Sequence, residues 1–158
     1  MHQKTYIASV IITLRGERKM EIKNTVQSLC HKFNTANPYK LADDLGIQIY
    51  YYDLGTIRGY YYKAFNIKQI FLHNGLAEHI EKFVLAHEIG HSVMHPNCNT
   101  PFLQSTFYSV NKLEIQANKF AAELIIQDID LMEHWDYTIA QLAVFYGLPR
   151  EIIELRLK

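Results

Sequence analysis

Residues 87–91 read His-Glu-Ile-Gly-His and lie in a largely apolar run that ends at Pro96. Imidazole and carboxylate groups resist burial unless a partner satisfies them. Positions i and i+4 of an α-helix differ by about 40° in azimuth and about 6 Å in height, so the rings of His87 and His91 would project side by side. Two imidazoles in this arrangement can bind one metal ion, and the spacing therefore predicts a metal site on this helix.

Glu88 would supply the chemistry of such a site. A catalytic zinc ion has three protein ligands and leaves its fourth position to water. Glu88 directly follows His87, which displaces its carboxylate to the flank where that water would lie. There the carboxylate can accept a proton from the water and later pass it to a leaving amine. H-E-x-x-H on a helix is a known motif of zinc peptidases that use this mechanism. We assign Glu88 as the catalytic acid/base because it occupies the glutamate position of that motif.

The alternative for the motif is a pair of surface or hydrogen-bonded core histidines beside an exposed glutamate. The surrounding sequence favours a metal site, because the motif lies in a periodic helical pattern and follows a predicted strand. Small or apolar residues, which would exclude water from one side of the ion, frame the motif: Ala86, Ile89, Gly90 and Val93.

The third protein ligand must come from another part of the chain. His95 follows His87 by eight residues, hence by about 12 Å along a continuous helix, whereas two ligands of one zinc ion lie only about 3–4 Å apart. His95 is therefore excluded, and we expect it to form a hydrogen bond at the helix end or to support the ligands. Glu114 opens a downstream helix whose small alanines permit close approach to the motif helix. A lone helix-surface glutamate is usually only solvated, but beside this motif we predict Glu114 as the third ligand, with Asn118 able to reach the same site.

The first half of the chain predicts two helices and three strands. Residues 21–33 place apolar side chains at helical spacing, and a short helix follows Asn37, with Pro38 at its first position and Gly46 at its left-handed exit. Three β-branched and aromatic runs come next, "IQIYYYD", "TIRGYYYKAFN" and "KQIFLH", separated by short turns. They predict a three-stranded antiparallel sheet.

The second half of the chain is predicted to be helical. The motif helix continues to Pro96, and an irregular connection, "PNCNTPFLQSTFYS", leads to the long helix "VNKLEIQANKFAAELIIQ". The tail "TIAQLAVFYGLPREIIELRLK" predicts a helical hairpin around Gly147. The elements together predict an α+β domain in which the sheet packs on helices.

Composition indicates one domain without a strong charge bias. The chain has 158 residues, 49% of them hydrophobic, and 16 basic side chains balance 16 acidic ones, so neither nucleic acid nor a membrane surface is an expected partner. We expect residues 20–158 to form the domain and residues 1–19 to be an extension of uncertain status. The apolar run from Tyr6 to Leu14 is too short to span a bilayer and lacks the flanks of a signal peptide. Cys30 and Cys98 form no motif, which fits a reducing, cytoplasmic location.

The stretches "FVLAHEIGHSVMH" and "EIQANKFAAELI" resemble the active-site helix and the downstream glutamate helix of the ImmA/IrrE family of small zinc metallopeptidases. The likeness extends from about Lys23 to the C-terminus, with minor departures such as Ile89, where the family often has Leu. It implies a small zincin-like, more narrowly gluzincin-like, fold. It also implies that His87, His91 and Glu114 bind Zn²⁺ while Glu88 acts as catalytic acid/base.

The resemblance further implies a substrate class, since family members from phage-like and mobile elements cleave helix-turn-helix repressors or antitoxins and so relieve repression. We expect the strand "QIFLH" to bind an extended substrate as an additional strand. Candidates for stabilising the anionic intermediate are His73, Tyr108 and His95. The connection from Asn97 to Ser109 could act as a lid that restricts access to flexible segments of a folded partner.

Two other functions compete with a peptidase. The first is a regulatory module that holds a structural zinc and binds a transcription factor without cleaving it. The second is a DNA-binding protein, suggested by the helical tail. That tail combines Arg150 and Arg156 with Glu151 and Glu154, which phosphates would repel, so DNA binding is disfavoured.

Overall fold

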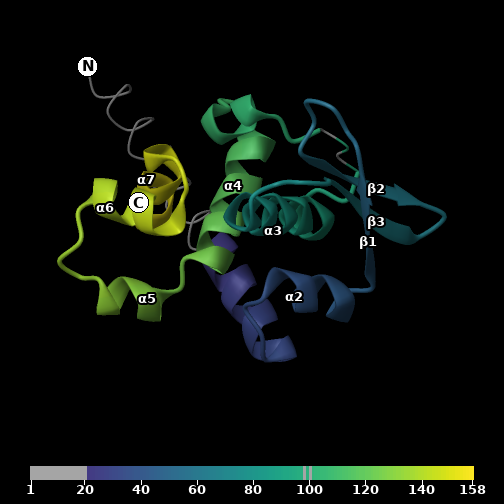
Figure 1. The fold of residues 1–158 in the computed structure, drawn as a ribbon. Coiled ribbons are helices and arrows are strands. Elements are labelled where there is room, and N and C mark those ends of the chain that lie inside the picture. Colours follow the sequence, from purple (N-terminus) through teal and green to yellow (C-terminus); the bar gives the residue numbers. More distant parts are fainter. Residues whose placement is uncertain (1–20, 98, 100) are drawn as a thin grey trace, which may run out of the picture.

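A computed structural model describes residues 21–97, 99 and 101–158 (Figure 1). The extension predicted for residues 1–19 lies outside the described residues. Helix α3 (Glu78–Met94) occupies the middle of the fold, with the β-sheet on one side and α4 (Lys112–Ile125) on the other. None of the described helices is long and apolar enough to cross a membrane.

The sheet has three strands, β1 (Ile47–Tyr52), β2 (Gly59–Ala64) and β3 (Ile67–His73), in the spatial order β1-β3-β2. β2 and β3 form an antiparallel hairpin. Their two-residue turn, Phe65 and Asn66, has φ angles of 49° and 64°, as a tight hairpin turn with the right twist requires. β1 instead runs parallel to β3.

The expectation of a fully antiparallel sheet is therefore wrong for β1. The connection of residues 53–58 passes the end of β3 and places β2 on the far side of it. β3 then fills the middle position, where His73 N donates to Arg58 O and Asn74 N donates to Tyr52 O. The short turn sequence after β1 looks like a hairpin turn, so the local pattern could not reveal this crossing. β3 has partners on both edges, and it cannot accept a substrate strand as the sequence had suggested.

The helices before and around the motif begin and end close to where the sequence predicts. Residues 21–33 are helical. In α2 (Pro38–Asp44) the predicted cap is confirmed, because the side chain of Asn37 accepts hydrogen bonds from the backbone of Tyr39 and Lys40. α3 ends at Met94, one residue before His95, as the proline that follows requires.

The connection between α3 and α4 is more ordered than predicted. It contains a 3₁₀ helix, η1 (Gln104–Tyr108), and an antiparallel bridge between Phe102 and Gly59 on the outer edge of β2. The side chains of Phe102 and Phe107 are buried in the core. These two rings hold residues 101–108 against the body of the fold.

The C-terminal part comprises α5 (Asp128–Glu133), α6 (Ile139–Tyr146) and α7 (Arg150–Leu157). The predicted hairpin of α6 and α7 is confirmed, with Gly147 at φ 64° ending α6. The sequence did not indicate α5, which follows α4 after a short break.

Buried charges attach α7 to α4. Arg156 Nε donates to Ile126 O at 2.8 Å and lies 3.3 Å from Glu123 Oε2. Lys119 Nζ donates to Leu155 O at 2.8 Å and pairs with Glu123 Oε1 at 2.9 Å. Because these contacts occupy Arg156 inside the protein, its guanidinium is not available to bind a DNA phosphate.

Gly90 marks the closest approach of α3 to α4. A Cβ at this position would lie 3.1 Å from the Cβ and Cγ atoms of Phe120. We predict that Gly90→Val lowers the free energy of unfolding by about 1–3 kcal/mol, the usual cost of overpacking a core, measured by urea denaturation of the metal-free protein. Ala140→Val adds bulk at an exposed position of α6 and should cost less than about 1 kcal/mol. Equal losses in the two variants would contradict the packing argument.

The contacts that attach α7 to the rest of the fold depend on pH through Asp128. Its carboxylate accepts a hydrogen bond from Lys23 and pairs with Arg156, and these contacts hold the pKa of Asp128 below its usual value. The ionised pair therefore stabilises the fold above the unfolded pKa of about 4, and this contribution is lost as the pH falls through the folded pKa.

We predict that Asp128→Asn unfolds at lower urea concentration than the parent at pH 7, and that the difference shrinks as the pH falls below about 4. Asp44→Asn is the matched control, since Asp44 forms no ion pair with any described residue. A difference for Asp128→Asn that stays constant with pH would show that the ion pairs do not contribute.

Candidate metal centre

The three predicted ligands converge between α3 and α4. His87 and His91 project from one face of α3, and Glu114 projects from the first turn of α4. The Nε2 atoms of the two histidines lie 3.0 Å apart. The Glu114 carboxylate completes a triangle with them, with Oε2 at 3.2 Å from His87 Nε2 and Oε1 at 3.4 Å from His91 Nε2. All three side chains are almost completely buried.

This triangle has the size of a tetrahedral zinc site. Bonds of roughly 2.0–2.1 Å at the tetrahedral angle place two ligand atoms about 3.3 Å apart, which is close to the distance between the two Nε2 atoms and to the distance from each ring to its nearest Glu114 oxygen. Glu114 Oε2 is buried and has no hydrogen-bond partner among the described residues, so a cation would satisfy an otherwise unpaired atom. Two imidazole nitrogens and one carboxylate form a donor set that suits zinc. The residues present therefore fit a divalent metal ion.

The protonation states also suit a metal. Burial acts to raise the pKa of Glu114, but the facing rings of His87 and His91 outweigh it and lower the pKa to about 2. Burial lowers the pKa of His87. Both shifts favour the forms that bind metals, an ionised carboxylate and a neutral imidazole.

Asn118 fixes the tautomer of His87. Its amide nitrogen donates to Thr106 O at 2.8 Å, and its amide oxygen lies 2.9 Å from His87 Nδ1. The carbonyl of Thr106 can only accept, so the amide oxygen must face the ring, and Nδ1 of His87 must carry the proton. The lone pair of His87 is thereby left on Nε2, which points at the other ligands. Asn118 thus orients the ring of the predicted ligand His87 and links it to η1.

Glu88 lies beside this triangle and is fully buried. Its Oε2 accepts a hydrogen bond from the backbone N–H of Tyr61 in β2 at 2.8 Å, while Oε1 has no partner among the described residues. Burial and the negative charge of Glu114 raise the pKa of Glu88 well above its usual value, although the Tyr61 amide acts in the opposite direction. The Tyr61 amide therefore fixes Oε2 of Glu88 and leaves Oε1 without a hydrogen bond beside the predicted ligands.

The other candidate residues take different positions. His95 directly follows the last residue of α3, and its ring centroid lies 5.8 Å from that of His91. It does not belong to the group of possible ligand atoms. His73 Nδ1 accepts from Leu54 N, so this ring supports the loop between β1 and β2. Tyr108 lies at the end of η1 and is about half exposed.

Sequence reasoning missed three residues around the centre. Tyr61 holds Glu88 through its backbone, and no side-chain pattern reports a backbone donor. Phe102 packs the edge of its ring on His87, with centroids 4.7 Å apart. Thr106 acts through its carbonyl oxygen. The available signal in the sequence was the spacing of four residues between Glu114 and Asn118. It places both side chains on one face of α4, and Asn118 is the residue that contacts Thr106.

Comparison with known proteins identifies the family. Residues 42–158 match the family of IrrE N-terminal-like domains, peptidase family M78. The chain belongs to the ImmA/IrrE family. The matched region includes both helices that carry the candidate ligands, and the resemblance stated from the motifs is confirmed.

Two relatives of this ImmA/IrrE chain are known by name. It is 37% identical over 139 residues to an immunity region protein of Bacillus phage phi105, which covers 85% of this chain and 88% of the relative. It is 33% identical over 142 residues to metallopeptidase ImmA of Bacillus subtilis strain 168, covering 86% of this chain and 83% of the relative. These matches support a metallopeptidase, and a metallopeptidase requires a metal ion.

We predict that Asn118→Ala weakens the affinity for a divalent metal by about 10–100-fold, because His87 loses the acceptor that fixes its tautomer. Zn²⁺ competition against a chromophoric chelator measures this affinity. Asn118→Asp, which can still accept from Nδ1, should recover most of it. If both variants bind Zn²⁺ as the parent does, Asn118 does not position the ligand. If Asn118→Asp is as weak as Asn118→Ala, the lost bond to Thr106 is responsible instead.

Proposed function

We propose that this protein is a zinc-dependent endopeptidase that cleaves a helix-turn-helix repressor or antitoxin and so relieves repression. One observation carries the enzymatic part of the proposal, namely that three buried ligand atoms converge beside a buried carboxylate, Glu88, that none of them needs as a ligand. A purely structural zinc site would usually have four protein ligands. Three ligands with a carboxylate beside them suit a catalytic site.

In this proposal His87, His91 and Glu114 hold Zn²⁺, and Glu88 is the catalytic acid/base. The ion would polarise the scissile carbonyl and its bound water. Glu88 would take a proton from the attacking water, on the oxygen that Tyr61 does not hold, as the water oxygen bonds to the scissile carbon. It would then pass the proton to the peptide nitrogen as the C–N bond breaks. The hydrogen bond from Tyr61 keeps the carboxylate aimed at the site during both transfers.

The outer edge of β2 is the part of the sheet suited to hold an extended substrate. Tyr61 N–H already points outward from this edge, to Glu88. Phe102 occupies the edge at Gly59, so a substrate strand would pair beyond that point, toward Lys63. Its backbone would then pass directly beside the catalytic carboxylate.

A repressor as substrate is supported by two features. One named relative is a phage immunity region protein, which fits the phage-type family members that, by the resemblance, cleave repressors. The centre is also enclosed, since its ligands are almost fully buried and Phe102 packs directly on His87. Restricted access favours a flexible segment of one partner over general proteolysis.

We predict about one equivalent of Zn²⁺ per folded chain, with loss of the metal in His91→Ala and Glu114→Ala. Glu88→Gln should retain the zinc and lower cleavage of a substrate found among candidate repressors from the genomic neighbourhood by about 10²–10⁴-fold, the usual contribution of a general acid/base. Casein should be cleaved poorly by the parent. Metal analysis and gel-based cleavage measure these effects.

Two results would contradict the proposal. A folded parent that binds no zinc from excess metal would rule out the metal centre. A repressor that binds but stays intact with both the parent and Glu88→Gln would favour the regulatory module with a structural zinc.

A further inference from the structure

Large apolar side chains are exposed on α5, on α6 and between them. We call them the α5–α6 surface: Ile129, Met132, Trp135, Tyr137, Val144 and Phe145. Trp135 and Val144 each expose 84% of their surface, and Met132 exposes 71%. The His134 ring joins Tyr137 and Phe145, at centroid distances of 4.7 and 4.5 Å. Exposed apolar groups gathered in this way mark interaction sites.

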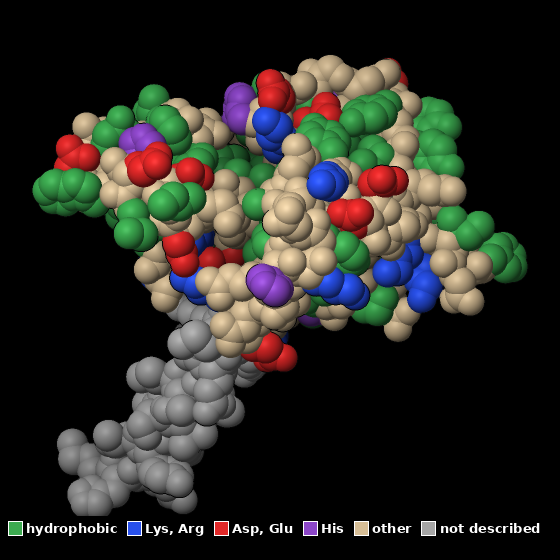
Figure 2. All heavy atoms as spheres, turned by 90° about the horizontal axis from the view of Figure 1, so that it is seen from below, with side chains coloured by type: hydrophobic (Ala, Val, Ile, Leu, Met, Phe, Trp, Pro, Cys, Tyr) green, Lys and Arg blue, Asp and Glu red, His purple; other side chains and the backbone are tan. Residues whose placement is uncertain are grey.

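The same segment is acidic. Its only formally charged side chains between Gln127 and Pro149 are those of Asp128, Asp130, Glu133 and Asp136. Asp128 is paired with Lys23 and Arg156, whereas the other three form no ion pair with any described residue. Figure 2 shows hydrophobic and acidic side chains next to one another on the projecting part of the surface at the left. The complementary partner is a segment that is both apolar and cationic.

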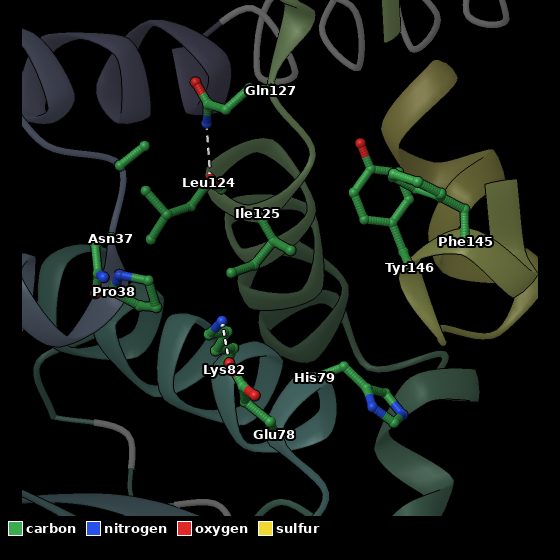
Figure 3. Close-up of a pocket in the computed structure, with 11 residues that line it drawn as sticks. Asn37, Pro38, Glu78, His79, Lys82, Leu124, Ile125, Gln127, Phe145 and Tyr146 are labelled. Atoms are coloured by element: carbon green, nitrogen blue, oxygen red, sulfur yellow. Dashed lines mark hydrogen bonds and ion pairs between the residues drawn. The ribbon is translucent and has the colours of Figure 1, made fainter. Parts of the chain in front are cut away.

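A cavity continues this surface under α6. Phe145 and Tyr146 face Ile125 and Leu124 of α4 and His79 of α3 across a space of about 480 Å³ (Figure 3). Phe145 belongs to both the cavity wall and the α5–α6 surface, so the two features are continuous. A bulky apolar side chain of a partner could enter this space, as anchor residues do at protein interfaces.

We propose that the α5–α6 surface and its cavity dock a basic amphipathic helix of the protein substrate. The inference rests on the proposed function, because a DNA-binding repressor carries Lys and Arg side chains that neutralise phosphates. An amphipathic helix presents apolar anchors every three or four residues. The anchors would cover Trp135 and Met132 while the flanking cations meet Glu133 and Asp136.

A second copy of this chain suits the surface less well. A twofold interface places the same patch on both partners, so the acidic side chains of one copy would meet the acidic patch of the other and repel. Nucleic acid is disfavoured for the same reason, since phosphates would meet unpaired carboxylates. A cationic protein segment is the occupant that matches both the apolar and the acidic character.

The α5–α6 surface lies away from the edge of β2 where the substrate strand is proposed to bind. α5 and α6 lie on the opposite side of α4 from the sheet (Figure 1). A partner held there does not compete for the edge of β2. Docking would raise the local concentration of the scissile segment at the metal centre, which provides specificity without contacts at the scissile bond.

Binding is tested in the full-length Glu88→Gln protein, so that no cleavage intervenes. The probe is a fluorescein-labelled 14-residue helix of Leu and Lys with Leu at helical spacing, and its counterpart carries Glu in place of Lys. Two variants alter the surface, Met132→Ser/Trp135→Ser and Glu133→Lys/Asp136→Lys. Two matched controls alter exposed residues elsewhere, Phe65→Asn in the hairpin turn and Asp43→Lys/Asp44→Lys in α2.

Fluorescence anisotropy should show that both surface variants bind the Lys probe at least fivefold more weakly than the parent, while the controls stay within twofold. The Glu probe should bind at least fivefold more weakly than the Lys probe. Equal binding by parent and surface variants would overturn the proposal. So would a dimer of the parent that the surface variants abolish, because the occupant would then be a second copy.

Cleavage by the active enzyme separates this inference from the proposed function. Met132→Ser/Trp135→Ser should raise KM for the repressor at least fivefold, with kcat and zinc content unchanged. Cleavage with an unchanged KM would overturn the docking surface and leave the peptidase intact. If the parent cleaves no repressor, the proposed function fails, and the probe measurements still decide what the surface binds.

Discussion

The burial of four polar side chains in one place is the constraint on which the rest of the structure depends. His87, Glu88, His91 and Glu114 are withdrawn from water, and each would cost free energy without partners. Hydrogen bonds with Asn118 and Tyr61 compensate part of this cost, and a bound cation would compensate more, because one ligand atom from each of His87, His91 and Glu114 lies within 4.8 Å of the others. The surrounding elements can be understood as the means of keeping these groups together.

Three contacts hold the centre from different directions. Gly90 lets α4 approach α3 closely enough to bring Glu114 over the histidines. Asn118 connects His87 to η1 and fixes its tautomer. The backbone of Tyr61 connects Glu88 to the sheet. Helix, loop and strand are therefore coupled through the site, and a shift in any one of them would change its chemistry.

The C-terminal helices have a different character. Buried ion pairs of Lys119, Glu123 and Arg156 attach α7 to α4, whereas α5 and α6 leave apolar and acidic side chains in solvent. Because α7 is attached to α4 by buried ion pairs while α5 and α6 expose apolar and acidic side chains, this part of the fold suits recognition of a partner. The proposed docking of the substrate and the proposed chemistry therefore lie on opposite sides of α4.

Features that depend on local geometry could be predicted from the sequence alone. The i, i+4 spacing of His87 and His91, the cap at Asn37 and the end of α3 before Pro96 follow from the regular dimensions of a helix. Contacts between distant segments were decided only by the tertiary structure. β1 runs parallel to β3 because a crossing loop separates β1 from β2, and Tyr61 serves Glu88 through a backbone group that every residue possesses. Short-range patterns do not encode such contacts, since they arise from how the elements pack.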